Sequence, residues 1–129
     1  MEVMQAKDAL GSAGILGGTG VVLGAFGAHM MRPYLLSAGV ADVWETAVHY
    51  QLIHAVALVG LAGWMRGAVE QGLRRAAWAV RLWTVGTVLF SGSLYLLALG
   101  GPKWLGPVTP AGGAALIAGW VMAAASAAG

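Results

Sequence analysis

The sequence predicts an all-α integral membrane bundle of four transmembrane helices, with a short interfacial segment between helices one and two. Hydrophobic residues make up 59% of the 129 residues and charged residues only 9%, whereas about a quarter of the residues in a soluble domain are charged. The apolar residues also gather into four runs, each near the ~20 residues that a helix needs to cross a bilayer. We therefore expect residues 1–129 to form a single transmembrane domain.

The first apolar run predicts a helix over residues 10–31. Its glycines follow one another by three or four positions, so they share one face of the helix. A row of small residues lets a second transmembrane helix approach closely, because packing holds helices together in lipid. We expect helix packing at Gly17, Gly20, Gly24 and Gly27.

The segment 33–41 is too short to span a bilayer but apolar enough to lie at its surface. Arg32 and Pro33 end the first run, and Tyr34 is a residue type that gathers at the membrane interface. We therefore expect an interfacial segment here.

A second helix is expected over residues 43–65. Asp42 is placed to act as its N-cap, and Glu45 follows three residues later, as in a capping box. Glu45 and His49 are four positions apart and are expected to pair. An interfacial salt bridge from Arg32 to Asp42 or Glu45 is also expected, and it is worth little free energy if it is wet.

The third and fourth helices are expected over residues 76–99 and 110–128. A basic connection, residues 66–75, precedes the third, and a turn-rich link, residues 100–109, precedes the fourth. Thr109 followed by Pro110 is a typical helix start. On the fourth helix, packing is expected at Gly112 and Gly119.

Basic residues predict the orientation of the bundle, because cytoplasmic loops carry an excess of Lys and Arg. With both termini in the cytoplasm, five basic residues lie inside and two, Arg32 and Lys103, lie outside. The five are Lys7, Arg66, Arg74, Arg75 and Arg81. We therefore expect a protein of the bacterial cytoplasmic (inner) membrane. The six tryptophans, mostly near helix ends, are expected to form an aromatic belt, and they are Trp44, Trp64, Trp78, Trp83, Trp104 and Trp120.

Three stretches resemble a known family of small membrane proteins. They are GAFGAH (residues 24–29), ETAVHYQLIHAVAL (45–58) and LFSGSLYLLAL (89–99), the last followed by LGPVTPAGG (105–113). The sequence is similar to domain-of-unknown-function family 423, which includes YgdD-like and transmembrane protein 256-like proteins. The resemblance implies a four-helix membrane protein and no established activity. It also implies a set of recurring polar positions, which together make a candidate polar pocket: His29, Glu45, Tyr50, Gln51, His54, Ser91 and Tyr95.

His54 is the deepest ionisable residue of the second helix, and it admits two interpretations. In the first, it stays neutral and bonds a neighbouring helix, with Ser91 or Tyr95 as its partner. In the second, His29 and His54 together bind a metal or haem, or relay protons, since neutral imidazole suits both. The second interpretation lacks carboxylate or thiol ligands at metal spacing, so no cofactor and no metal are predicted. Thr87, Ser91 and Tyr95 recur every fourth residue and are expected to join helices.

The functional prediction follows from what the residues offer. No nucleophile with its base, carboxylate pair or phosphate-cradling loop is evident, so we do not expect an enzyme, and without a basic stripe we expect no nucleic acid partner. The first hypothesis is a non-catalytic accessory subunit of a larger membrane complex, or a homo-oligomer, in contact with the lipid bilayer. The second is small-molecule or ion binding, or transport, through an outer-leaflet histidine pocket.

Overall fold

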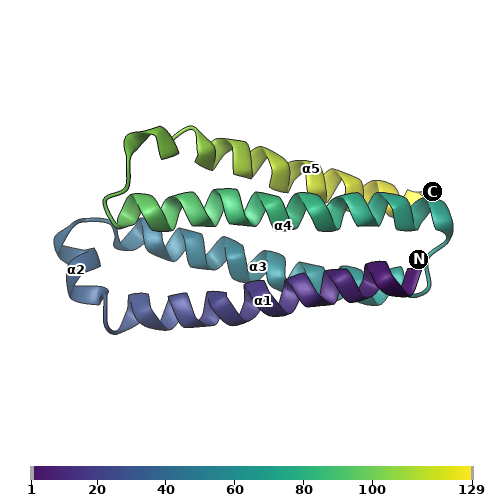
Figure 1. Cartoon of the computed structure of the whole chain (residues 1–129), viewed down its shortest axis with the longest axis horizontal. Coiled ribbons are helices and arrows are strands. Elements are labelled where there is room, and N and C mark those ends of the chain that lie inside the picture. Colours follow the sequence, from purple (N-terminus) through teal and green to yellow (C-terminus); the bar gives the residue numbers. More distant parts are fainter. Residues whose placement is uncertain (1, 129) are drawn as a thin grey trace.

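Four long helices make up most of the chain (Figure 1), and they are α1 (Glu2–Ala28), α3 (Ala41–Met65), α4 (Glu70–Ala98) and α5 (Val108–Ala128). The structure is a computed structural model that describes residues 2–128, with side chains from residue 5 onward. Each of the four helices is long and apolar enough to cross a membrane. The described residues contain no strand. The predicted class, an all-α bundle with four membrane-spanning helices, is confirmed.

Two helices begin earlier than the apolar runs suggest. α1 begins at Glu2 instead of near residue 10, and α4 begins at Glu70 instead of near residue 76. The apolar runs begin near residues 10 and 76, but helical backbone hydrogen bonding continues through the polar residues before them, because no proline interrupts it. In α4 the extra turns place Arg75 beside the end of α5, where its Nη1 donates to the Ala125 carbonyl at 2.8 Å.

A six-residue helix, α2 (Arg32–Ser37), occupies the expected interfacial segment and lies across one end of the bundle (Figure 1). Gly39 ends it with a φ of 71°, a left-handed conformation that glycine adopts without steric cost. The Val40 N–H then donates to the Leu35 carbonyl at 2.9 Å, and the Gly39 N–H donates to Leu36 at 3.2 Å. These two bonds reverse the chain into α3.

The same device ends α4. Gly100 has a φ of 87°, and the Gly101 N–H donates to the Leu96 carbonyl at 2.7 Å while the Gly100 N–H donates to Leu97 at 3.1 Å. A short 3-10 turn, η1 (Lys103–Leu105), then leads into α5.

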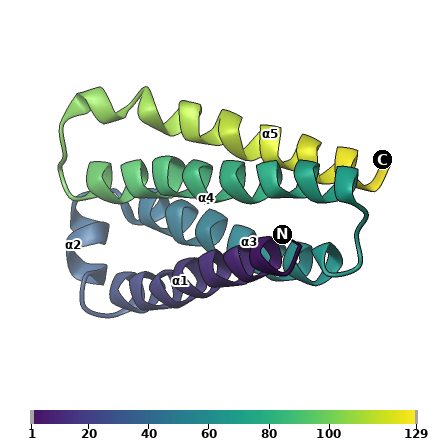
Figure 2. The ribbon, with the colours of Figure 1, turned by 45° about the vertical axis from the view of Figure 1, so that its right-hand side comes forward.

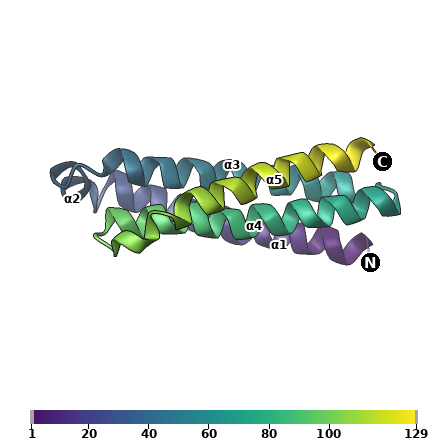
Figure 3. The same cartoon turned by 90° about the horizontal axis from the view of Figure 1, so that it is seen from above.

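The helices pack as two antiparallel pairs that share one interface. α1 lies along α3, α5 lies along α4, and the contact between α3 and α4 joins the pairs. Figure 2 shows α5 over α4 and α4 over the α1–α3 pair, and Figure 3 shows α5 crossing α4 at a shallow angle. Both termini lie at the end that holds the α3–α4 connection, while α2 and η1 lie at the other end (Figure 1).

The predicted glycine row of α1 forms the seam with α3. A methyl group added to Gly20 would lie 2.8 Å from Cδ2 of Leu52, and one added to Gly24 would lie 3.2 Å from Cγ1 of Val48. A side chain at these positions would require Leu52 or Val48 to shift, so the glycines allow the two helices to approach closely. In order along α1 the pairs are Gly17 with Ala55, Gly20 with Leu52, Gly24 with Val48, and Gly27 with Trp44.

Glycines also bring α4 and α5 together. A methyl group on Gly112 would overlap the backbone of Phe90, and one on Gly119 would overlap the indole of Trp83. Trp83 and Trp44 are therefore buried inside the bundle, at 2% and 3% exposure. The prediction that these two tryptophans belong to an aromatic belt is therefore wrong, because each indole fills the space beside a glycine on the facing helix.

The expected starts of the second and fourth helices differ from those in the structure. Val40 precedes α3, no side chain caps it, and Asp42 lies within the first turn. The predicted capping box of Asp42 and Glu45 is therefore wrong, because the chain reverses direction at Gly39 and α3 begins before Asp42. Thr109 is the second residue of α5, and its hydroxyl pairs with that of Ser93 on α4 at 2.5 Å.

Candidate functional site

A hydrogen-bonded network centred on Gln51 joins three of the helices. Its amide Nε2 donates to the Leu16 carbonyl at 2.9 Å and to Thr19 Oγ1 at 2.8 Å, both on α1. Its Oε1 accepts a bond from the Tyr95 hydroxyl of α4 at 2.7 Å. Both amide hydrogens are thus in use, and Gln51 is buried at 4% exposure. Such a saturated network holds helices in register and leaves no donor for a ligand.

The polar row on α4 contributes one further bond to α3. Ser91 Oγ donates to the Ala47 carbonyl at 2.7 Å, so Ser91 and Tyr95 join α4 to α3 as the sequence predicted. Thr87, the third member of the row, differs. Its Oγ1 is buried without a hydrogen-bond partner, as is Nε1 of Trp83.

His54 lies in an aromatic cluster with Trp83 and Trp120. The ring centroids of these two indoles lie 6.0 Å and 5.8 Å from that of His54. Trp120 Nε1 approaches His54 Nε2 at 3.0 Å, and His54 Nδ1 lies 2.8 Å from the Tyr50 carbonyl oxygen. An indole N–H is only a donor, so Nε2 accepts and Nδ1 carries the proton. His54 is therefore a neutral imidazole with both nitrogens engaged.

The partner of His54 differs from the expected ones. Ser91 and Tyr95 bond Ala47 and Gln51, which lie nearer the start of α3, whereas His54 faces Trp120 on α5. The interpretation of His54 as a neutral, bonded residue is supported, but the residue that bonds it is Trp120.

His29 and His54 lie at different levels of the bundle. His29 is exposed and follows the end of α1, where Gly27 contacts Trp44 of α3. His54 is ten positions beyond Trp44, which is about 15 Å along a helix axis. Imidazole ligands lie ~2 Å from a metal, so these two residues do not share one ion or haem iron. Among the described side chains, no group of three or more His, Cys, Asp or Glu is placed to hold a metal.

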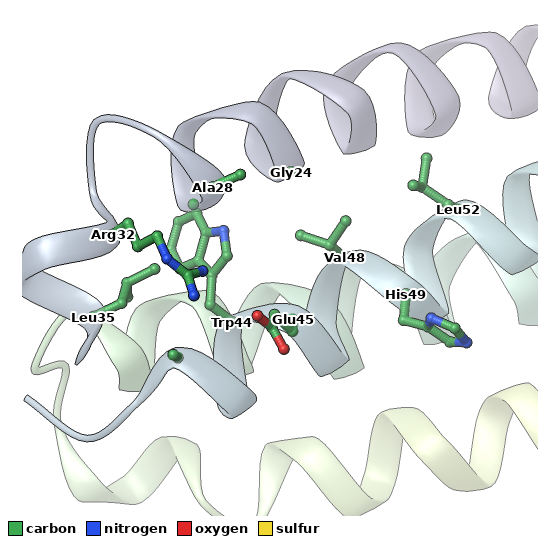
Figure 4. A pocket seen from close by; sticks show the side chains of 11 residues that line it. Gly24, Ala28, Arg32, Leu35, Trp44, Glu45, Val48, His49 and Leu52 are labelled. Carbon is green, nitrogen blue, oxygen red and sulfur yellow. The ribbon is translucent and has the colours of Figure 1, made fainter.

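A pocket of about 210 Å³ opens where the end of α1, α2 and the start of α3 meet. Its charged lining residues are Arg32 and Glu45, and His49 lies beside them. Figure 4 shows Arg32 reaching from the start of α2 toward Trp44 and Glu45, with Val48 and Leu52 pointing to α1. The indole N–H of Trp44 donates to the Leu23 carbonyl of α1 at 2.9 Å, which fixes the pocket wall.

Arg32 forms no salt bridge with the acidic residues beside it. No nitrogen of Arg32 lies within 4.0 Å of a carboxylate oxygen of Asp42 or Glu45, and the same holds between Glu45 and His49. The two expected ion pairs are therefore wrong, because these side chains lie around an open space instead of against each other.

The predicted polar residues thus divide among four places. Gln51, Ser91 and Tyr95 bond between helices, Tyr50 and His54 belong to the aromatic cluster, Glu45 lines the pocket, and His29 is exposed. Sequence reasoning missed Thr19, Trp120 and the pocket role of Arg32. The signal for Arg32 was its position as the single basic residue between two apolar runs.

Comparisons with known proteins agree with this description. The family described as "Protein of unknown function (DUF423)" matches residues 23–113. A UPF0382 membrane protein of Staphylococcus haemolyticus is 44% identical over 99 residues, which is 77% of each chain. The UPF0382 inner membrane protein YgdD of Escherichia coli is 38% identical over 110 residues, covering 85% of this chain and 81% of YgdD. No solved structure matches. The chain therefore belongs to the DUF423 family of membrane proteins.

Proposed function

We propose that this chain is a non-catalytic protein of the bacterial cytoplasmic membrane that acts by associating with other membrane helices. It does so as a homo-oligomer or as an accessory subunit of a larger complex. The interior supports the non-catalytic part of the proposal. The buried polar side chains form hydrogen bonds within the chain and so stabilise the fold. These side chains are Gln51, His54, Ser91 and Tyr95.

The observation that carries the proposal is a second row of glycines on α1. Gly11, Gly14 and Gly18 are exposed, and a methyl group on any of them would meet no atom within 4 Å. The row at Gly17 to Gly27 is already used against α3. Gly14 and Gly18 have the four-residue spacing at which transmembrane helices approach closely, so this second face favours a further helix from outside the chain.

The distribution of basic residues supports an orientation with both termini in the cytoplasm. Lys7, Arg66 and Arg75 lie at the end of the bundle that holds the termini, whereas Arg32 and Lys103 lie at the end with α2 and η1 (Figure 1). An excess of basic residues marks the cytoplasmic side.

The experiment compares glycine substitutions on two faces. The labelled protein is reconstituted in liposomes at low density, and subunits are counted by single-molecule photobleaching. Gly14→Leu with Gly18→Leu places bulky side chains on the open row of α1. The matched control is Gly92→Leu on α4, where a side chain also meets no atom within 4 Å.

Wild type and Gly92→Leu are expected to associate, while the double variant is monomeric. If the protein is an accessory subunit, the wild type extracted from its own membranes in mild detergent is expected to migrate as part of a larger assembly. The double variant is then expected to migrate separately from that assembly. A wild type that stays monomeric in both measurements contradicts the proposal.

The second hypothesis, a ligand site built from His29 and His54, has less geometric support. His54 is buried with both ring nitrogens engaged. His29 follows the end of α1 that packs on Trp44, and Trp44 lies about 15 Å from His54 along the axis of α3. The lined cavity beside α2 instead uses Arg32 and Glu45.

A further inference from the structure

The pocket at the α1–α2–α3 junction holds two opposite charges that do not neutralise each other. Arg32 from α2 and Glu45 from α3 both line it. Within the described side chains, neither forms a hydrogen bond or ion pair with a protein group. Both side chains are exposed, so their charged groups are free to bind a ligand at this pocket. Two unpaired opposite charges around one space favour a ligand that carries both signs.

The rest of the pocket is apolar and continues away from the charges. Gly24, Val48 and Leu52 line its inner part along the seam between α1 and α3. A shallow apolar groove then follows α3 through His49, Leu52, Ile53 and Val56. Because His49 and Leu52 line both hollows, the pocket and groove form one path from the charges toward the middle of the span. A ligand that fits has a charged head and a hydrocarbon tail.

The level of the charges matches a lipid headgroup. The first candidate span ends at Ala28 and the second begins at Ala41, and Arg32 lies in the chain between them. A phospholipid standing in its leaflet places its phosphate at this level and its acyl chains beside the spans. The Arg guanidinium is suited to phosphate, because its planar N–H groups match two phosphate oxygens.

We propose that the pocket binds one phospholipid with a phosphoethanolamine headgroup. The phosphate accepts hydrogen bonds from Arg32, the primary ammonium donates to Glu45, and one acyl chain follows the groove past Leu52 and Val56. Asp42 and Glu45 also line an adjoining hollow on α3, which makes that side anionic and suits the ammonium group. Phosphatidylglycerol lacks the ammonium, and its net negative charge faces two carboxylates.

This site is independent of the proposed association. Its α1 lining residues are Gly24, Gly27 and Ala28 at the α2 end of the helix, whereas Gly11, Gly14 and Gly18 lie nearer the N-terminus and do not line it. Either can fail without the other.

The test is native mass spectrometry of delipidated protein in mild detergent, titrated separately with palmitoyl-oleoyl phosphatidylethanolamine and with palmitoyl-oleoyl phosphatidylglycerol. Arg32→Gln and Glu45→Gln remove the two proposed contacts. The matched controls, Arg66→Gln and Glu70→Gln, make the same changes at the opposite end of the bundle. Far-UV circular dichroism verifies that each variant is folded.

Wild type is expected to bind one phosphatidylethanolamine about fivefold more tightly than phosphatidylglycerol, which is roughly 1 kcal/mol. Glu45→Gln should remove that preference, and Arg32→Gln should weaken both lipids about fivefold. Arg32→Lys keeps the charge and should bind more tightly than Arg32→Gln. Equal binding of both lipids by wild type, or equal losses in Arg32→Gln and Arg66→Gln, overturns the proposal.

Discussion

Trp120 of α5 donates its indole N–H to Nε2 of His54 on α3 at 3.0 Å. α5 packs mainly on α4, so this bond ties the outermost helix to a helix beyond its direct neighbour. It also explains why a buried imidazole is tolerated in the bundle. The proton sits on Nδ1 facing the Tyr50 carbonyl, and no ring nitrogen is left without a partner.

The bond between Trp120 and His54 should contribute measurably to folding. We expect Trp120→Phe and His54→Leu each to lower the free energy of unfolding, with a coupling of about 1 kcal/mol in a double-mutant cycle. The measurement is reversible unfolding in mixed micelles. Trp104→Phe is the control, because Trp104 is 68% exposed. Additive losses from the two substitutions would show that the bond stabilises nothing.

Removing the Tyr95 hydroxyl should destabilise the protein, whereas removing that of Tyr50 should not. Tyr95→Phe leaves Oε1 of buried Gln51 without its donor, at a cost of about 1 kcal/mol. The Tyr50 ring packs on Phe90 at a centroid distance of 4.7 Å, and no bond of its hydroxyl is among those of the described side chains. The unfolding free energies of the two variants are compared, and equal losses would argue against a network centred on Gln51.

Removing the hydroxyl of Thr87 should stabilise the protein, unlike removing that of Tyr95. Its hydroxyl is buried with no partner, so Thr87→Val keeps the shape and removes an unsatisfied polar atom. We expect the free energy of unfolding to rise by about 1 kcal/mol. Ser91→Ala, one turn later, should lower it by a similar amount because Ser91 bonds the Ala47 carbonyl. A loss of stability in Thr87→Val would reveal a hydroxyl partner.

Packing between α1 and α3 should depend on Gly27 more than on an open glycine. A methyl group at Gly27 overlaps the Trp44 indole, and overpacking of this kind costs about 1–3 kcal/mol. Gly92→Ala meets no neighbouring atom and should raise stability by up to about 1 kcal/mol through helix propensity. Thermal unfolding in detergent distinguishes the two, and similar transition temperatures would mean that the seam is not tightly packed.

The sequence predicted the spans because hydropathy and length alone identify a transmembrane helix. It did not predict where α1 and α4 begin, since helical bonding continues through polar residues such as Glu70. The glycine row at Gly17 to Gly27 was recognised as a packing face, but its partner was not. A row of small residues indicates that another helix packs closely on this face, but it does not identify that helix.

The site was less predictable than the fold. Residue type indicated that His54 would bond within the bundle, but its partner depends on how α5 crosses α4. Gln51 was expected only as a candidate pocket residue. Trp120 is among the six tryptophans expected to form an aromatic belt, although it lies near the middle of α5. The pocket at Arg32 and Glu45 exists only because α2 folds back at Gly39, which brings residues from two elements around one space.

Native mass spectrometry of the protein extracted in mild detergent, with an absorbance spectrum of the same sample, tests the central claim most directly. The account predicts a multiple of the 13.1 kDa chain, or a complex with another membrane subunit, with or without bound phospholipid and without a haem band. A monomer without any partner subunit, with or without bound metal or haem, would contradict it.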